Sequence, residues 1–396
     1  MKNKLSTILV TAFVTAIICS LCFVLFMPNN AVELSEEDSA FLKKFHTLKE
    51  YIDEYAIYEF DEEYAEDTAH LYYMTGLKDD PYSYYFTKEE LIEYNTENQG
   101  SFMGIGINVM TQTTVLEDGL YIYRVIGGSP AEAAGLMTGD KIIEADGISF
   151  INYPYEDAVD ILLDEEGTTV NLKVDRNGEI KIFSITRKAF EQRNVEYAVY
   201  DNLGYIRIYQ FAENADEQFQ DALNSLLAKN VEGIIFDVRN NPGGELNTVC
   251  NMIDMLIPGG EEIIVIEYKE EEEIIYSTNF RLADMPFVVL LNNDSASGSE
   301  LFSSALRDIL GTKLIGENSF GKGVGQTTFP LYDGSGIKVT TFKYLTKSRT
   351  DYNKTGLVPD YEIKLDSKWD MEFYTMTYED DIQLQKAISV LLQEIN

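Results

Sequence analysis

Hydrophobic and polar positions repeat with a helical period in the first part of the chain after residue 30. Between about residues 35 and 98, apolar side chains recur at helical spacing, as at Phe41, Phe45, Leu48 and Ile52. The sequence Asp80-Pro81-Tyr82-Ser83 is typical of a turn within this part. The pattern predicts a small helical region over residues 31–98.

The period changes near residue 100 to short β-type runs separated by glycine turns. The runs predicted as strands are Gly104–Val109, Leu120–Val125, Lys141–Ala145, Thr169–Val174 and Lys181–Thr186. One helix is expected among them, over Tyr155–Leu163. These elements predict a β-rich module over residues 99–188.

Strand-like and helical segments alternate from residue 189 to 365. The predicted strands are Gly204–Tyr209, Gly233–Val238, Ile263–Tyr268 and Phe287–Leu291, and the predicted helices are Ala215–Lys229 and Leu246–Ile257. Because such alternation requires crossover connections, it predicts an α/β domain with a mainly parallel sheet. Residues 366–396 form a last region, with a helix expected over Asp381–Glu394.

The N-terminus carries a different pattern, because Leu5–Met27 contains no charged residue and is long enough to cross a bilayer as a helix. Lys2 and Lys4 precede it, so residues 1–30 are predicted to be a cytoplasmic stub and a single-pass anchor, with the rest on the extracytoplasmic side. A cleaved signal peptide is the alternative. The apolar segment is longer than usual for one, and Pro28-Asn29-Asn30-Ala31 is a poor cleavage site, so an uncleaved anchor is favoured.

The charge excludes one class of partner. The formal net charge of −36 repels phosphate backbones, which argues against nucleic-acid binding. The run Glu270–Glu273 is interpreted as a solvated hairpin tip or loop rather than a metal site, because consecutive side chains point in different directions. Cys250 stands alone outside the apolar N-terminal segment, so no disulfide framework is expected.

The serine-rich junction after Phe287–Leu291 has two compatible interpretations. Ser297 is followed by Glu300 and then by an apolar helical pattern, which is typical of a capping box. A serine at the head of a helix also faces free N–H groups that can stabilise an oxyanion. Histidine is nearly excluded as its base, because the chain has only His46 and His70, both in the N-terminal region.

Lysine is the alternative base, since a desolvated lysine can titrate low enough to accept a proton near neutrality. Lys322 lies between glycines in Ser319–Gln326. A phosphate-binding loop at Gly316, Gly321 and Lys322 is disfavoured, because Gly323 stands where a Ser or Thr hydroxyl is needed. A glycine-rich surface loop with a solvated lysine is the remaining structural interpretation.

The chain resembles a known family at these two segments. Ser295–Glu300 and Phe320–Gln326 look like the paired signatures of the carboxy-terminal processing peptidases, or tail-specific proteases, and the spacing between them matches as well. Further stretches agree in order along the chain: Asp80–Ser83, Gly204–Ile208, Ile235–Gly244 and Gly356–Asp360. The resemblance therefore covers residues from about 80 to 365.

This resemblance implies a crotonase/ClpP-like peptidase core with named catalytic residues. Ser297 would be the nucleophile, Lys322 the general base and Gln326 the residue that orients it. One oxyanion donor would be the N–H of Gly298, and the other that of Gly243 or Gly244, a choice that the sequence leaves open. The resemblance implies no metal or cofactor. It does imply dimers that are built through the terminal regions.

The β-rich module carries a second resemblance, to PDZ domains, on Val125–Leu136 and Gly139–Ile143. Alone, the glycine-flanked loop before the first strand is either a carboxylate-binding concavity or a strand entry with unusual backbone angles. The PDZ resemblance implies that it binds the carboxylate of a substrate C-terminus with an apolar last residue. The loop residues are Phe102, Met103, Gly104, Ile105, Gly106 and Ile107.

Together these patterns predict an α/β multidomain, membrane-anchored serine endopeptidase that acts on protein or peptide substrates near or from their C-termini. The PDZ module would deliver the substrate or gate the site. The alternative is a catalytically silent PDZ adaptor at the cell surface. It would require the loss of a catalytic residue, and Ser297, Lys322 and Gln326 are all present.

Overall fold

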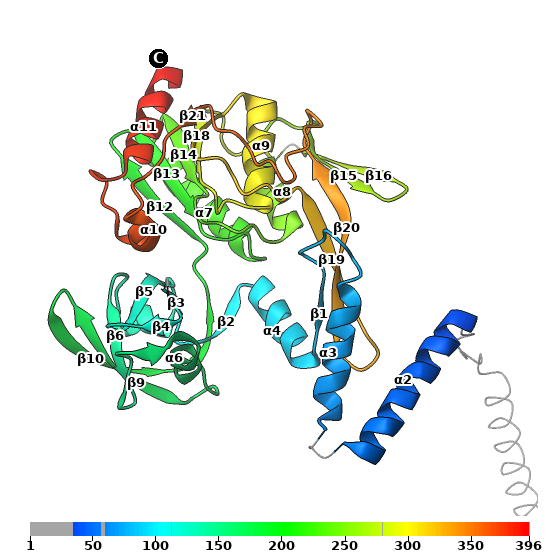
Figure 1. Cartoon of the computed structure of the whole chain (residues 1–396). Helices are drawn as coiled ribbons and strands as arrows, with labels where there is room; N and C mark the ends of the chain where they lie inside the picture. Colours follow the sequence, from blue (N-terminus) through cyan, green and yellow to red (C-terminus); the bar gives the residue numbers. More distant parts are fainter. Residues whose placement is uncertain (1–34, 57–59, 112, 279, 396) are drawn as a thin grey trace, which may run out of the picture. The chain divides into compact units, whose positions relative to one another are not determined.

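The structure, a computed structural model, describes residues 35–56, 60–111, 113–278 and 280–395 (Figure 1). The predicted membrane segment Leu5–Met27 lies outside these ranges. Within them, no helix combines the length and apolar character that crossing a membrane requires. The chain divides into two compact units between Ala69 and His70, and each is described by itself.

The first unit is helical, as the spacing of its apolar residues predicts. Helix α2 spans Glu36–Tyr55, and α3, Glu62–Met74, runs across the boundary into the second unit. The predicted apolar positions Phe41 and Leu48 lie on α2 and are largely exposed, at 60% and 53%. His46 pairs with Glu50 one turn further along the same helix, at 3.4 Å, and both side chains are solvent-exposed.

The second unit contains, near its start, one element that the helical prediction did not include. Strand β1, Tyr84–Phe86, pairs antiparallel with β20, Gly336–Leu345, far along the chain. Helix α4, Lys88–Asn98, follows it. The prediction of a purely helical region over residues 31–98 was wrong here, because a three-residue strand is too short to show a period of its own.

The PDZ module is built on a sheet with the order β10-β9-β6-β5-β3, with β7 paired to β6. Its core includes Leu120, Ile122, Ile142 and Val174, all inaccessible to solvent. The remaining short strands and two helices complete it. The elements are β2 (Ser101–Gly104), β3 (Ile107–Met110), β4 (Val115–Leu116), β5 (Leu120–Val125), α5 (Pro130–Ala134), β6 (Lys141–Ala145), β7 (Ile148–Ser149), β8 (Tyr153–Pro154), α6 (Tyr155–Leu162), β9 (Thr169–Arg176) and β10 (Glu179–Thr186).

The predicted strand Gly104–Val109 is broken in the structure. Strand β2 ends at Gly104 and β3 begins at Ile107, because Gly104 and Gly106 have φ values of 133° and 82° that strand geometry does not allow. Strand β2 leaves the sheet and pairs antiparallel with β11, Lys188–Glu191, at the far end of the module. The module is therefore entered and left through a two-stranded ribbon.

The central sheet of the peptidase region has the order β12-β13-β14-β17-β18-β21. All neighbouring strands in it run parallel except β12 and β13. Its strands are β12 (Val195–Tyr200), β13 (Leu203–Ile208), β14 (Gly233–Asp237), β17 (Phe287–Leu291), β18 (Lys313–Gly316) and β21 (Tyr361–Glu362).

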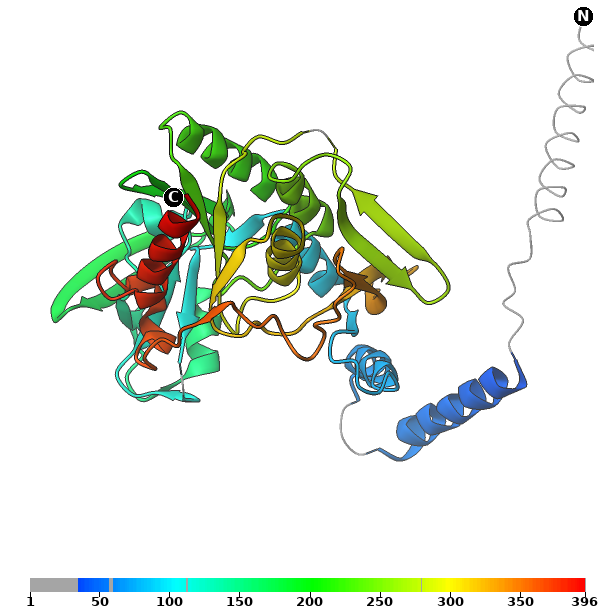
Figure 2. The ribbon, with the colours of Figure 1, turned by 90° about the horizontal axis from the view of Figure 1, so that it is seen from above.

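Helices cover both faces of this sheet (Figures 1 and 2). Along β14, Ile234 and Phe236 belong to the cluster that includes the helices α7, α8 and α9, whereas Ile235 belongs to the cluster with α11. Strand β14 is fully buried because side chains alternate between two covered faces. The helices are α7 (Ala215–Leu227), α8 (Leu246–Asp254), α9 (Gly298–Leu310) and α11 (Ile382–Ile395); the short α10 (Trp369–Glu372) and a 3-10 turn (Phe373–Thr375) precede α11.

A second sheet makes the peptidase region mixed rather than mainly parallel. Strands β15 (Glu262–Tyr268), β16 (Glu272–Tyr276), β19 (Val324–Pro330) and β20 join β1 in it, and all the pairs are antiparallel. The expectation that Ile263–Tyr268 belongs to the parallel sheet was therefore wrong, since a continuous apolar run does not reveal its partner. The acidic run Glu270–Glu273 covers the tip of the β15–β16 hairpin and the first two residues of β16, in agreement with the predicted hairpin tip.

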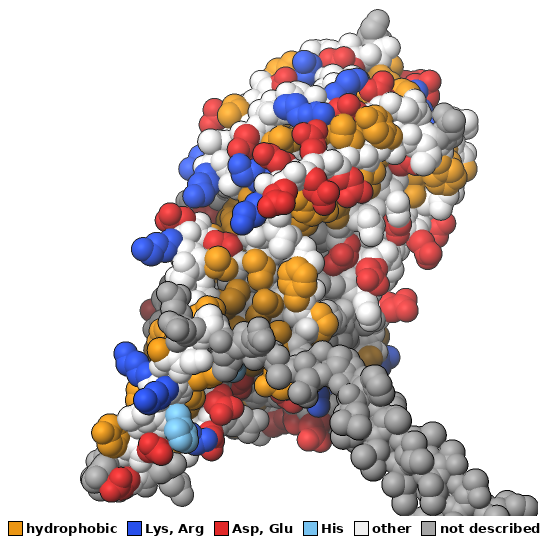
Figure 3. Space-filling view, turned by 90° about the vertical axis from the view of Figure 1, so that its right-hand side faces the viewer, with side chains coloured by type: hydrophobic (Ala, Val, Ile, Leu, Met, Phe, Trp, Pro, Cys, Tyr) orange, Lys and Arg blue, Asp and Glu red, His pale blue; other side chains and the backbone are white. Residues whose placement is uncertain are grey.

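Surface charge is distributed among residues of both signs. On the face shown in Figure 3, Lys and Arg side chains are interspersed with Asp and Glu, with hydrophobic side chains between them. One ionic cluster is internal: Arg239, after β14, contacts Asp237 at 2.6 Å and Asp381, before α11, at 2.8 Å. This buried cluster attaches α11 to the central sheet.

Candidate active site

Ser297 lies between β17 and α9, where it is the N-cap residue of the helix. Its backbone has φ 54° and ψ −113°, a conformation that costs a non-glycine residue about 1–3 kcal/mol. The predicted capping box is present, and the N–H of Ser297 donates to Glu300 Oε2 at 2.9 Å. The box therefore helps to hold the serine in its strained turn.

Glu300 connects the serine segment to the lysine segment. Its side chain is 1% exposed, and besides Ser297 it accepts the N–H groups of Gly321 at 2.7 Å and Lys322 at 2.8 Å, together with the hydroxyl of Ser319. Burial raises the pKa of Glu300, and these hydrogen bonds oppose the rise because they stabilise the carboxylate. One carboxylate thus fixes both motifs that the sequence singled out.

The other serines of the junction have structural partners. Ser295 Oγ donates to the carbonyl of Val238 and Ser299 Oγ to that of Asn241, each at 2.8 Å. Inside α9, Ser303 and Ser304 donate to backbone carbonyls one turn earlier. Among these serines, Ser297 is the one whose hydroxyl lies against Tyr344, a residue that also contacts Lys322.

Lys322 lies in the loop between β18 and β19, with its Nζ 4.7 Å from the ring centroid of Tyr82. Burial lowers the pKa of Lys322, and the charge of Lys338 lowers it further. A neutral amine is the form that can accept a proton. The chain continues from Lys322 into β19 rather than into a helix, which excludes the phosphate-loop interpretation.

Tyr344 on β20 contacts both segments. Its hydroxyl lies 3.0 Å from Ser297 Oγ and 2.6 Å from the carbonyl oxygen of Lys322. The described residues include no hydrogen bond between Lys322 Nζ and Ser297 Oγ. The structure therefore brings the two segments together, with Tyr344 bonded to Ser297 and the lysine amine over Tyr82.

Gln326 lies four residues after Lys322 on β19, and its side chain does not bond to the lysine in this arrangement. Its Nε2 donates to Thr340 Oγ1 at 3.2 Å, and Thr340 Oγ1 donates to Asp80 Oδ1 at 3.1 Å. Asp80 is one of the charges that act on Lys322. Gln326 thus belongs to a polar chain beside the lysine.

The glycine turn after β14 lies directly against the serine. A Cβ on Gly243 would come within 2.8 Å of both Ser297 Cβ and Gly298 N, so only glycine fits there. The N–H of Gly243 donates to Asn241 Oδ1 at 2.9 Å. In the described part of the chain, the N–H groups of Gly244 and Gly298 have no acceptor.

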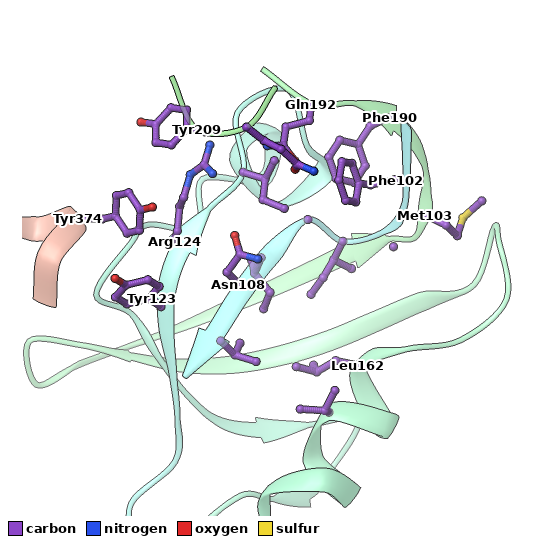
Figure 4. A pocket seen from close by; sticks show the side chains of 18 of the residues that line it. Phe102, Met103, Asn108, Tyr123, Arg124, Leu162, Phe190, Gln192, Tyr209 and Tyr374 are labelled. Carbon is purple, nitrogen blue, oxygen red and sulfur yellow. The ribbon is translucent and has the colours of Figure 1, made fainter. Parts of the chain in front are cut away.

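The predicted PDZ loop lines a cavity of about 500 Å³ (Figure 4). All six predicted residues, Phe102 to Ile107, contribute to its wall, and α6 contributes Val159 and Leu162. Residues of the peptidase region, including Tyr209, Asn240 and Pro242, close the other side. The cavity therefore joins the PDZ groove to the segment that leads into the Gly243–Gly244 turn.

Sequence reasoning missed the aromatic residues of the site. Tyr82 belongs to a stretch interpreted only as a turn and as typical of the family, and Tyr344 lies on a strand that was not predicted. The sequence indicated Glu300 as a capping residue and as the last residue of a family signature, with no role toward Lys322. His70 stacks on Tyr85 with 5.0 Å between ring centroids, which is a packing role, and Cys250 is a buried free thiol.

Comparisons with known proteins agree with this architecture. Residues 202–363 match peptidase family S41, and residues 92–175 match the PDZ domain. A carboxyl-terminal-processing protease of Picosynechococcus is 33% identical over 345 residues, covering 81% of this chain and 78% of that protein. A "Probable CtpA-like serine protease" of Staphylococcus haemolyticus is 34% identical over 287 residues, which cover 72% of this chain and 57% of that protein.

Among solved structures, the photosystem II D1 C-terminal processing protease has a TM-score of 0.52 and 27% sequence identity. The similarity covers 81% of this chain and 86% of that one. The sequence similarity and the fold similarity therefore agree, because both relate this chain to carboxyl-terminal-processing proteases.

Glu300→Gln tests the connection between the two motifs. An amide nitrogen cannot accept a hydrogen bond, so two buried donors lose their acceptor, and we expect the free energy of unfolding to fall by about 2–3 kcal/mol. Peptidase activity should fall roughly 100-fold, because Ser297 and Lys322 lose their relative placement. Urea unfolding and peptide hydrolysis measure the two effects.

Glu317→Gln is the matched control, because this half-exposed glutamate lies in the same loop, before the lysine motif, and should change neither quantity. An unchanged activity in Glu300→Gln would contradict the positioning role.

Proposed function

Since the chain belongs to peptidase family S41, the carboxyl-terminal-processing proteases, we propose that it cleaves proteins near or from their C-termini with Ser297 as nucleophile and Lys322 as general base. The observation that carries this proposal is the Glu300 carboxylate, which accepts hydrogen bonds from the backbone of both residues. A loop lysine without a catalytic role would not need to be fixed to the head of the serine helix.

The reaction follows from the chemistry of these groups. Neutral Lys322 takes the proton of the Ser297 hydroxyl, and Ser297 Oγ attacks the scissile carbonyl. The protonated lysine then delivers the proton to the departing amine. Water, activated by the same base, releases the acyl-enzyme.

The oxyanion is held by backbone N–H groups at the head of α9 and in the glycine turn. Gly298 and Gly244 are the donors in the present arrangement, because their N–H groups have no acceptor in the described part of the chain. Gly243 joins them only if Asn241 releases its N–H. Gln326 acts as a positioning residue for Lys322 once its amide leaves Thr340.

The arrangement described above is a resting one. For proton transfer, Lys322 has to leave the Tyr82 ring, and Ser297 has to exchange its contact with Tyr344 for one with the amine. The PDZ cavity offers a route for control, because Asn240 Nδ2 donates to the Tyr123 hydroxyl at 3.0 Å and precedes the oxyanion turn. A peptide in the cavity would act on that bond, which supports gating by the PDZ module.

The proposed substrate enters this cavity with a free C-terminus and an apolar last residue. The loop from Phe102 to Ile107 would bind the carboxylate, and the apolar side chains of α6 would line the groove for the last side chain. Family resemblance also supports a homodimer. Membrane attachment through Leu5–Met27, with the peptidase on the extracytoplasmic side, completes the proposal.

The central experiment uses the portion from residue 35 and an unstructured protein substrate with an apolar C-terminus, either free or amidated. We expect cleavage of the free acid, weaker cleavage of the amide, and a loss of at least 1,000-fold with Ser297→Ala or Lys322→Ala. Gel analysis with mass spectrometry of the products measures this. Undiminished cleavage by either variant would exclude the Ser297–Lys322 dyad. If the parent protein bound the peptide but did not cleave it, the silent adaptor would be favoured.

Lys338→Met tests the lysine base through its pKa. Burial lowers the pKa of Lys322 first, and Lys338 lowers it further by like-charge repulsion. Removing that charge raises the pKa of Lys322, so a higher pH is needed to deprotonate the base. We expect the acidic limb of the kcat/KM profile to move to higher pH, whereas Lys343→Met, an exposed residue of the same strand, should leave it in place.

Membrane attachment is tested with the full chain. We expect it to sediment with membranes and to resist extraction by high salt, because an apolar helix of this length is held by the bilayer core. Deletion of residues 5–27 should release it into the soluble fraction. A shortened mature N-terminus, detected by mass spectrometry, would instead identify the segment as a cleaved signal peptide.

A further inference from the structure

Arg124 is the charged residue in the wall of the PDZ cavity. The other residues that line it are apolar, aromatic, glycine or neutral amides, and no Asp or Glu is among them. This is notable in a chain whose net charge is −36. A cavity with a single positive charge and no carboxylate is complementary to an anionic ligand.

The side chain of Arg124 is buried, and none of the described carboxylates forms an ion pair with it; Glu196, which accepts the Tyr209 hydroxyl, acts on its charge without such a pair. It is 9% exposed, and its guanidinium carbon lies 3.4 Å from the ring centroid of Tyr209 and 5.7 Å from that of Tyr374 (Figure 4). Stacking uses the flat face of a guanidinium and leaves its N–H donors in the plane. Among the described residues no side-chain hydrogen bond or ion pair satisfies those donors.

The position of Arg124 in the sheet determines which part of a bound peptide it meets. Arg124 on β5 is paired with Asn108 on β3, whereas the flanking residues Ile107, Val109 and Val125 pack on the hydrophobic core of the module. Asn108 and Arg124 therefore occupy the opposite face, which is turned toward Tyr209 of the peptidase region.

A peptide added to β3 alternates its side chains between these two faces. With its carboxylate on the loop before Ile107, its last side chain points to the apolar groove near α6. The preceding residue lies level with Asn108 and turns its side chain to the face of Arg124. On the basis of the proposed function, we propose that Arg124 binds a carboxylate side chain at the penultimate position of the substrate.

The inferred substrate class is thus a protein that ends in Asp or Glu followed by an apolar residue. The bond would be a charge-assisted pair in a largely desolvated site, the kind of pair that discriminates strongly against an uncharged isostere. Arg124 is in this view a residue for specificity, separate from the groups that bind the terminal carboxylate.

The test measures binding to the full chain carrying Ser297→Ala, so that peptides are not consumed. The probes are fluorescein-labelled ten-residue peptides that end in valine. One pair carries Glu or Gln at the penultimate position, and a second pair carries Glu or Gln at the fourth position from the end. Each peptide is made with a free C-terminal carboxylate and with a C-terminal amide. Fluorescence anisotropy gives the dissociation constants. We expect penultimate Glu to bind about 5–10-fold more tightly than Gln, with little effect at the fourth position.

Variants of the arginine assign the effect. Arg124→Gln should reduce the Glu-to-Gln ratio to below about 2-fold, and Arg124→Lys should retain part of it because the charge remains. Arg193→Gln removes the same charge outside the cavity, where Arg193 pairs with Glu132, and should leave the ratio unchanged. Thermal unfolding of each variant confirms that the PDZ module is folded.

The outcomes separate this inference from the proposed function. The inference about Arg124 would be overturned if the Glu and Gln peptides bound equally, or if the difference between them survived Arg124→Gln. In either case, a preference for free acids over amides would still uphold the PDZ role. A loss of that free-acid preference in Arg124→Gln would show that Arg124 binds the terminal carboxylate, which also overturns it. Equal binding of acids and amides by the parent would contradict the PDZ role itself.

Discussion

The buried carboxylate of Glu300 is the constraint on which the geometry of the proposed catalytic site depends. It accepts hydrogen bonds from the backbone beside the serine and from the backbone of the lysine loop, two segments that are joined through α9 and β18. Desolvating a carboxylate is costly unless its oxygens are well satisfied, and here each has two donors. The same bonds that make Glu300 tolerable inside the protein therefore fix Ser297 and Lys322 relative to one another.

This constraint acts on the backbone, whereas the two side chains have other partners in this arrangement. Ser297 contacts Tyr344, and the amine of Lys322 lies over Tyr82, so each proposed catalytic group contacts a tyrosine. Tyr344 belongs to β20, and Tyr82 lies in the segment just before β1. Strands β1 and β20 pair in one antiparallel sheet. That sheet therefore contributes to the proposed catalytic site as well as to the fold.

The sequence was informative where chemistry and local structure coincide. The capping box, a signal within a short stretch, predicted Ser297 at the head of α9, whereas Lys322 was indicated by its glycine-flanked loop and by the scarcity of histidine along the whole chain. The antiparallel sheet and its tyrosines were not predictable, since β1 and β20 are separated by most of the chain and an apolar run does not specify its partner. Arg124 was missed for the same reason: its unpaired state depends on Tyr209 and Tyr374, which only the fold brings to it.

The ribbon formed by β2 and β11 has a mechanical consequence for the PDZ module. A domain carried on one covalent strand can rotate about many bonds, whereas a domain carried on two hydrogen-bonded strands moves mainly by bending across the ribbon. The motion of the module is then restricted mainly to rotation about a single axis. If the module moves as the proposed gating requires, the ribbon would return the same face of it to the same part of the peptidase region, so a chain end bound there would be presented in one orientation.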